Sequence, residues 1–115
     1  MEIIKGPEDD TRNAACKSAE FAYEYAKHVD KCPRDDTREA ACESPHYAYF
    51  YVKNIDKYPR DDTRKAACKD PWWACCYARK IDKEPRNDTW MAVKNTEYEN
   101  KYKEFFNNQM KEEII

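Results

Sequence analysis

The sequence is short of glycine, of long apolar runs and of excess charge of either sign. Gly6 is the one glycine among 115 residues. All-β folds need many tight turns, which favour glycine, so an all-β fold is not expected. No apolar run approaches the roughly 20 residues of a membrane helix, and residues 1–5 lack the apolar stretch of a secretory signal. We therefore expect a cytoplasmic protein that does not enter a membrane. The formal net charge of −2 predicts no general attraction to nucleic acid.

Histidine is also scarce, and the six cysteines do not form a pattern typical of metal sites. His28 and His46 are the only histidines, and no pair of cysteines has C-x-x-C spacing, so we expect no metal site. Cys16, Cys42 and Cys68 each follow Ala-Ala at equivalent places in the chain. Neighbouring helices lie about 8–10 Å apart, whereas a disulfide needs Cα atoms within about 7 Å. We expect these cysteines to be small buried residues and not disulfide partners.

The chain does contain a motif that is repeated at a constant spacing. Residues 33–38, with the sequence PRDDTR, return unchanged 26 residues later as residues 59–64. A looser copy occupies residues 7–12 and a more divergent one residues 85–90. Self-similarity at such a period is typical of a stacked repeat array. We expect a single domain over residues 1–115, with repeats at about 7–32, 33–58, 59–84 and 85–115.

Each repeat is predicted to form a helical hairpin. In the second copy, Asp35 or Asp36 can cap a short helix over residues 37–43, because a short carboxylate accepts hydrogen bonds from free backbone N–H groups. Ser44 can cap a second helix over residues 45–57, which begins with proline, as helices often do. The predicted fold is therefore all-α, a short α-solenoid of about four helical hairpins.

The two ends of the array are expected to differ from its middle, as capping repeats do. Ile3 and Ile4 can cover the N-terminal edge of the first repeat. The fourth copy carries Trp90 where the others carry arginine. Its last helix, predicted over residues 96–113, is longer than the others and would close the array.

Helical spacing predicts which side of each second helix faces the core. The expected core set repeats through the chain as Phe21, Ala22, Tyr25, Ala26 and Val29, then Tyr47, Ala48, Tyr51, Val52 and Ile55, then Trp73, Ala74, Tyr77, Ala78 and Ile81, and finally Tyr98, Tyr102 and Phe106.

Arginine and aspartate recur with the same period. The arginines are Arg12, Arg38 and Arg64, and the aspartates are Asp30, Asp56 and Asp82. We favour a row of ion pairs that fixes each hairpin to the next, because the arginine fork binds a carboxylate through two hydrogen bonds. The alternative is an anion-binding row in which Arg12, Arg38 and Arg64 hold phosphate groups.

The other side of the second helices changes from polar to aromatic along the chain. It carries Glu20, Tyr23, Glu24 and Lys27 in the first copy, then His46, Tyr49, Phe50 and Lys53, then Trp72, Cys75, Cys76 and Arg79. Exposed apolar patches often mark interaction sites, and interfaces are rich in aromatic residues. The predicted protein-binding residues are Tyr23, His46, Tyr49, Phe50, Trp72, Cys75, Cys76 and Arg79. Alternatively, the last helix or a second copy in a homodimer covers this stripe.

The segment Ser44–Val52, with Asp56 and Lys57 after it, resembles a known type of short helical repeat. Repeats of this type have the pattern Asp/Ser-Pro-x-x-Ala-Tyr-x-Tyr-Ala-x-x-Val and are common in bacteriophage and bacterial proteins of unassigned role. The resemblance covers nearly the whole chain. For a viral chain it implies a small accessory protein that inhibits a host factor, such as a defence nuclease, in the manner of an anti-CRISPR protein.

Three classes of function follow from these patterns, and a non-enzymatic protein-binding module is the one we favour. The alternative is a nucleic-acid or phosphate-ligand binder that uses the arginines, but the near-neutral charge makes nucleic acid the less expected partner. We expect no enzymatic activity and no cofactor. A catalytic site usually places a base beside its nucleophile, yet neither Cys75 nor Cys76 has a base nearby in the sequence, and one glycine cannot form a phosphate-binding loop.

Overall fold

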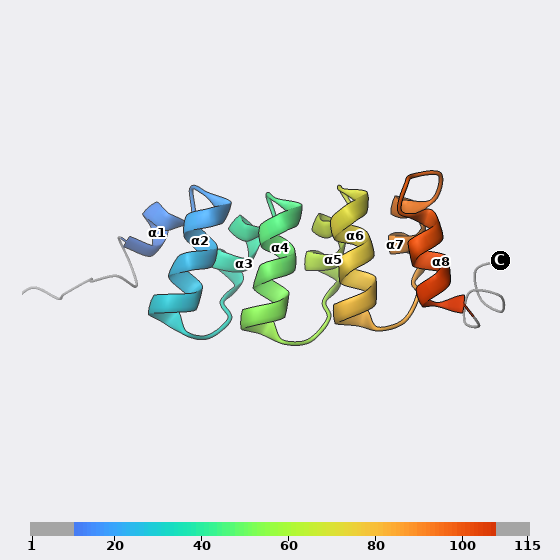
Figure 1. Cartoon of the computed structure of the whole chain (residues 1–115). Coiled ribbons are helices and arrows are strands. Elements are labelled where there is room, and N and C mark those ends of the chain that lie inside the picture. The colour runs from blue at the N-terminus through green and yellow to red at the C-terminus, as the bar shows by residue number, and fades with distance from the viewer. Residues whose placement is uncertain (1–10, 108–115) are drawn as a thin grey trace, which may run out of the picture.

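The computed structural model describes residues 11–107, which form an elongated row of helices with no strand among them (Figure 1). The row measures 64 × 20 × 16 Å. The first helices of the four repeats are α1 (Arg12–Ala15), α3 (Asp35–Ala41), α5 (Asp61–Ala67) and α7 (Asn87–Val93). The second helices are α2 (Ala19–Tyr25), α4 (Pro45–Tyr51), α6 (Pro71–Tyr77) and α8 (Glu99–Phe105). The predicted all-α array of hairpins is confirmed.

The helices form two layers. In Figure 1 the second helices stand side by side along the row, and the first helices lie behind them. Each of α3, α5 and α7 packs against the second helix of the preceding repeat. The second helices α2, α4 and α6 also contact one another in sequence order. Every repeat is therefore held to the next through both layers.

The second helices begin where the sequence predicts, because their N-terminal backbone groups find side-chain partners. The Ser44 hydroxyl accepts the backbone N–H of Tyr47 at 3.3 Å, and the Asp70 carboxylate accepts that of Trp72 at 2.9 Å. A proline follows each cap at the first helical position, where no N–H partner is needed. These caps fix the chain direction at the start of each second helix.

The first helices begin earlier than predicted. In the second repeat α3 starts at Asp35 and not at Thr37, and the cap residue Arg34 makes no side-chain cap bond. Asp36 lies in the first turn, where its carboxylate accepts the backbone N–H of Thr37 at 2.7 Å. Negative charge there also faces the positive end of the helix. Acidic residues in the first turn thus replace the expected acidic cap.

The last helix also differs from the prediction at its start. Asn95 takes a left-handed conformation with φ of 66°, and the Thr96 hydroxyl bonds back to the carbonyl of Val93 at 2.6 Å. This turn delays α8 to Glu99, three residues after the predicted start. The helix also ends at Phe105, so α8 is no longer than the other second helices and the predicted longer helix was wrong. The predicted stretch from 108 to 113, like the role expected for Ile3 and Ile4, lies outside the described residues.

Three second helices end in a π-helical turn that the sequence did not predict. These turns are η2 (Ala26–Asp30), η3 (Val52–Asp56) and η4 (Ala78–Asp82). Each closes with a backbone bond of 2.7–2.8 Å from a lysine N–H to the carbonyl five residues earlier. The lysines, Lys31, Lys57 and Lys83, have positive φ angles of 57°, 66° and 59°. Glycine usually occupies such a position because it has no Cβ to clash.

Substituting glycine at one of these positions is expected to stabilise the protein. Lys57→Gly removes a Cβ from a left-handed residue, which we expect to raise the free energy of unfolding by about 0.5–1 kcal/mol. Urea unfolding of the variant and the wild type measures the change. The matched control is Lys53→Gly, one turn earlier in η3, where glycine should lower stability by about 1 kcal/mol. Equal destabilisation by both changes would contradict the proposed strain at Lys57.

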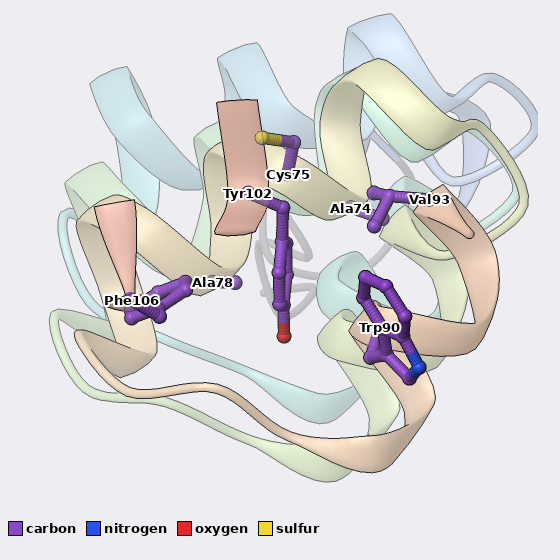
Figure 2. Packing of buried hydrophobic residues seen from close by; sticks show 7 residues of the cluster. All are labelled: Ala74, Cys75, Ala78, Trp90, Val93, Tyr102 and Phe106. Carbon is purple, nitrogen blue, oxygen red and sulfur yellow. The ribbon is translucent and has the colours of Figure 1, made fainter. Parts of the chain in front are cut away.

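Most of the predicted core is buried. Tyr51, Tyr77 and Tyr102 have no exposed surface, and neither have Ala22, Ala48 and Ala74 of the first three second helices. Figure 2 shows the C-terminal cluster, in which the Tyr102 ring lies between Trp90 and Phe106. The ring centroids are 5.7 Å apart for Trp90 and 4.9 Å for Phe106. Trp90 stands where the other repeats have arginine, and it makes an apolar contact there in place of an ion pair.

Two predicted core residues are exposed. Phe21 is 61% and Val29 47% exposed. The residues at the same places in the second repeat are Tyr47, which packs on Tyr23 of the preceding helix, and Ile55, which is buried. No described helix precedes α2 on that side. The prediction was wrong because it assigned this side of the helix to the core of its own hairpin, whereas it packs on the preceding repeat.

Candidate functional site

The repeated arginines and aspartates form buried ion pairs between the two helices of each of the first three repeats. Arg38 Nη2 lies 2.7 Å from Asp56 Oδ1, and Arg38 Nε lies 3.0 Å from Asp56 Oδ2. The Asp56 side chain has no exposed surface, and that of Arg38 is 6% exposed. The hydrogen bonds to Asp56 raise the pKa of Arg38, which stays charged. A third contact, 2.8 Å from Nη1 to Asp35, occupies the outer side of the guanidinium.

The same arrangement occurs in the neighbouring repeats. Arg64 bonds Asp82 at 2.8 and 2.9 Å and Asp61 at 2.7 Å, and Arg12 bonds Asp30 at 2.7 Å. These residues form the Arg–Asp ladder, and the predicted pairing of arginine with aspartate is confirmed. The prediction that these pairs join neighbouring hairpins was wrong, because each pair lies within one hairpin. A guanidinium that is buried and already bound to carboxylates has few donors left for a phosphate. The geometry therefore weighs against the alternative that Arg12, Arg38 and Arg64 form an anion-binding row.

A second repeated unit, which sequence reasoning missed, centres on a buried tyrosine hydroxyl. The Tyr77 hydroxyl accepts the backbone N–H of Arg60 at 2.9 Å and lies 2.6 Å from the Thr63 hydroxyl. It also lies 2.9 Å from the Arg60 carbonyl oxygen, to which it can donate. Tyr51 and Tyr102 make the same contacts in their own repeats. The signal in the sequence is a threonine, in the PRDDTR motif and its fourth copy, that recurs in step with the tyrosine.

Part of the predicted protein-binding stripe is buried inside the array. Tyr23 and Tyr49 are each 4% exposed, Cys76 is 5% exposed and Cys75 has no exposed surface. The Tyr23 ring lies 5.7 Å from that of Tyr47 on the next second helix. These four side chains were predicted to face solvent, and that prediction was wrong. Tyr23, Tyr49 and Cys75 pack against the following second helix, whereas Cys76 packs against Tyr49 of the preceding one. Second helices thus pack directly on one another.

The remaining aromatic side chains form a half-buried surface across the array. We call this surface the aromatic ridge, and its members are His46, Tyr47, Phe50, Trp72, Trp73 and Tyr98. His46 stacks on Trp73 with centroids 4.9 Å apart and planes 10° apart, although the two residues belong to different repeats. Trp72 continues the contact to Tyr98, at 5.4 Å. The ridge thus includes three predicted site residues, His46, Phe50 and Trp72, and joins them to three that were predicted as core.

Arg79, the last predicted site residue, lies apart from the ridge. It is half-buried, and its guanidinium carbon lies 5.7 Å from the centre of the Phe105 ring of α8. This is the geometry of a cation–π contact. Arg79 therefore helps to join the third and fourth repeats.

Five of the six cysteine thiols have the surroundings of structural residues, whereas Cys32 is exposed. All six are free; Cys75 and Cys76 are buried, and Cys16, Cys42 and Cys68 are half-buried. Burial raises the pKa of Cys42 to about 11 and that of Cys68 to about 12. Burial likewise raises the pKa of Cys76. A nucleophilic cysteine needs a lowered pKa. Burial raises the pKa of these thiols and therefore makes them less reactive.

No helix in the described part of the chain is long and apolar enough to cross a membrane. Among residues 11–107, no three His, Cys, Asp or Glu side chains gather as a metal site would require. A scan against protein-family models and searches of the curated proteins and of the solved structures find no match for this chain.

Proposed function

We propose that this protein is a non-catalytic binding module that holds a partner protein through the aromatic ridge. The observation that carries the proposal is the row of six half-buried rings, which runs over α4, the start of α6 and the turn before α8. Large aromatic side chains dominate the energetics of protein interfaces. Their partial exposure leaves apolar area for a partner to cover.

The ridge is also rigid, which supports binding. His46 and Phe50 pack against Trp73 from the next repeat, with centroid distances of 4.9 and 5.8 Å. Trp72 is held between Trp73 and Tyr98. Rings already fixed in place lose little conformational entropy on association, so more of the contact energy appears as affinity.

The resemblance to bacteriophage repeats suggests which partner to seek. On that basis the partner would be a host factor, such as a defence nuclease, and the protein its inhibitor in the cytoplasm. A second copy of this chain is the other partner that would cover the ridge, and light scattering separates the two. The proposal does not extend to nucleic acid, because the arginines of the ladder are bound to carboxylates.

Two substitutions on the ridge test the proposal. The double variant Phe50→Ala and Trp72→Ala removes two central rings and is expected to weaken binding at least about 100-fold, because interface hot spots are worth 2 kcal/mol or more each. The partner is captured from host lysate, identified by mass spectrometry and then titrated as purified protein by calorimetry. If the partner is a second copy, the same variant should convert a dimer to a monomer in light scattering.

The matched control is Tyr58→Ala, which removes a ring that is 52% exposed and lies off the ridge. We expect it to change affinity less than about threefold. Thermal melts confirm that each variant is folded at the assay temperature. Unchanged affinity of the folded double variant would refute the ridge as the binding surface.

A further inference from the structure

A second surface lies at the opposite ends of the same helices, where the π-helical turns of successive repeats form grooves. The groove between η2 and η3 has a volume of about 270 Å³, and Ala26, Pro33 and Ile55 form its apolar lining. The groove between η3 and η4 has a volume of about 340 Å³, with Val52, Pro59 and Ile81 in the same role. Their lining residues lie where each second helix ends and the loop to the next first helix begins. These helix ends form the lower edge of the row in Figure 1.

Lysine is the only charged residue type that lines these grooves. The lysines are Lys27, Lys31 and Lys57 in one groove and Lys53, Lys57, Lys80 and Lys83 in the other. By contrast, the hollow beside α5 and α7 carries both signs, with Asp61, Glu84 and Asp88 near Arg64, Lys65 and Arg86. A chain with a net charge of −2 therefore concentrates positive charge at one edge of its second-helix layer.

These lysines are not neutralised by the protein itself. Within residues 11–107, none of them lies within 4.0 Å of a carboxylate oxygen, whereas the ladder arginines do. Lys27 and Lys53 instead lie over the rings of Tyr23 and Tyr49. The aspartates at the ends of the π-helical turns, Asp30, Asp56 and Asp82, are bound to the ladder arginines. The lysine charges thus remain available to a ligand.

Three of the groove lysines also have an unusual backbone conformation. Lys31, Lys57 and Lys83 take the left-handed conformation, in which any side chain other than glycine costs free energy. Attraction to the negative end of a helix favours a cation anywhere in the last turn, so it does not require lysine at the left-handed residue. At these positions the three lysines line the two grooves.

We propose that the two lysine grooves bind an extended acidic peptide segment whose carboxylates meet the lysines and whose apolar side chains lie on the groove floor. The apolar lining favours a peptide over nucleic acid, since Tyr58 is the one aromatic residue among the groove residues and base stacking needs a series of rings. Adjacent grooves share Lys57. A single segment can therefore run across both. This surface is distinct from the aromatic ridge, and its proposal does not depend on the proposed function.

A short fluorescein-labelled peptide of repeated Asp-Glu-Leu units is the probe, titrated with the full chain by fluorescence anisotropy. The triple variant Lys53→Gln, Lys57→Gln and Lys80→Gln is expected to weaken binding at least about tenfold. The matched control, Lys17→Gln, Lys65→Gln and Lys69→Gln, removes the same charge from exposed lysines in α5 and in the turns after α1 and α5. We expect it to change affinity less than about twofold, because charges far from the groove are screened.

Charge reversal provides a gain-of-function arm. Lys53→Glu, Lys57→Glu and Lys80→Glu should bind a peptide of Lys-Arg-Leu units that the wild type does not. The ridge variant Phe50→Ala and Trp72→Ala should keep full affinity for the acidic peptide, which separates failure of this proposal from failure of the proposed function. Three results would each overturn the proposal: no binding of the peptide by the wild type, equal loss in both glutamine variants, or tighter binding of oligothymidylate than of peptide.

Discussion

Replacing Arg38 by alanine is expected to lower the free energy of unfolding by about 3–5 kcal/mol, the cost of breaking a buried ion pair from one side. The reason is the environment of Asp56. Its carboxylate has no exposed surface and accepts hydrogen bonds from both the Nε and the Nη2 of Arg38. Without the guanidinium, that carboxylate would stay buried without its cation, or would take up a proton. Urea unfolding followed by circular dichroism gives the change.

Controls separate the buried pair from the other contacts of Arg38. Asp35→Asn removes its exposed partner, whose side chain is 100% exposed, and should cost no more than about 0.5 kcal/mol. The double variant Arg38→Met and Asp56→Leu removes both charges and should recover most of the stability lost in Arg38→Ala, as apolar replacement of buried pairs often does. A double variant no more stable than Arg38→Ala would show that the arginine acts through packing on Tyr51 and not through charge pairing.

The pairing in the ladder could be predicted because arginine and aspartate recur in step, 18 residues apart in each of the first three repeats. Its place within one hairpin could not, because spacing alone does not show which helices meet. The hairpins followed from the same period, and the starts of the second helices from Ser44, Asp70 and the prolines after them. Helix caps depend on side chains that bond backbone groups only a few residues away. Such features can therefore be predicted from a short stretch of sequence.

The aromatic surface could be predicted only in part. A helical wheel separates the core side of α4 from its other side, but it does not show which flank meets the neighbouring second helix. That choice depends on how successive hairpins pack, which buries Tyr23 and Tyr49 and leaves Tyr47 and Trp73 half-exposed. The packing of successive hairpins thus decides which aromatic residues a partner can contact. It also explains why Phe21, with no described helix before it, is exposed.

The left-handed conformation of the three lysines could not be predicted from the sequence either. Glycine is the usual sign of such a residue, and here lysine stands in its place at Lys31, Lys57 and Lys83. The i to i−5 bonds that close each turn become visible only in the structure. The grooves that these turns form lie between repeats, so no single repeat contains them.

Tyr77→Phe is expected to lower the free energy of unfolding by about 2–3 kcal/mol, although it removes only one oxygen atom. That hydroxyl is buried, accepts the backbone N–H of Arg60 and lies 2.6 Å from the Thr63 hydroxyl. Its loss leaves the Arg60 N–H without this acceptor, and an unsatisfied buried group costs about 1–3 kcal/mol. The matched control is Tyr58→Phe, whose exposed hydroxyl accepts a bond from the Arg60 side chain and should be worth less than about 0.5 kcal/mol.

The same hydroxyl makes stability depend on alkaline pH. Burial raises the pKa of Tyr77 to about 12, above the value of about 10 for a tyrosine in an unfolded chain. The unfolded state therefore loses this proton first, so the contribution of Tyr77 is complete below about pH 10 and declines as the pH rises toward 12. Thermal melts between pH 9 and pH 11.5 should show a steeper loss of stability in the wild type than in Tyr77→Phe, which has no proton to lose. Parallel profiles for the two proteins would show that the buried hydroxyl does not control alkaline unfolding.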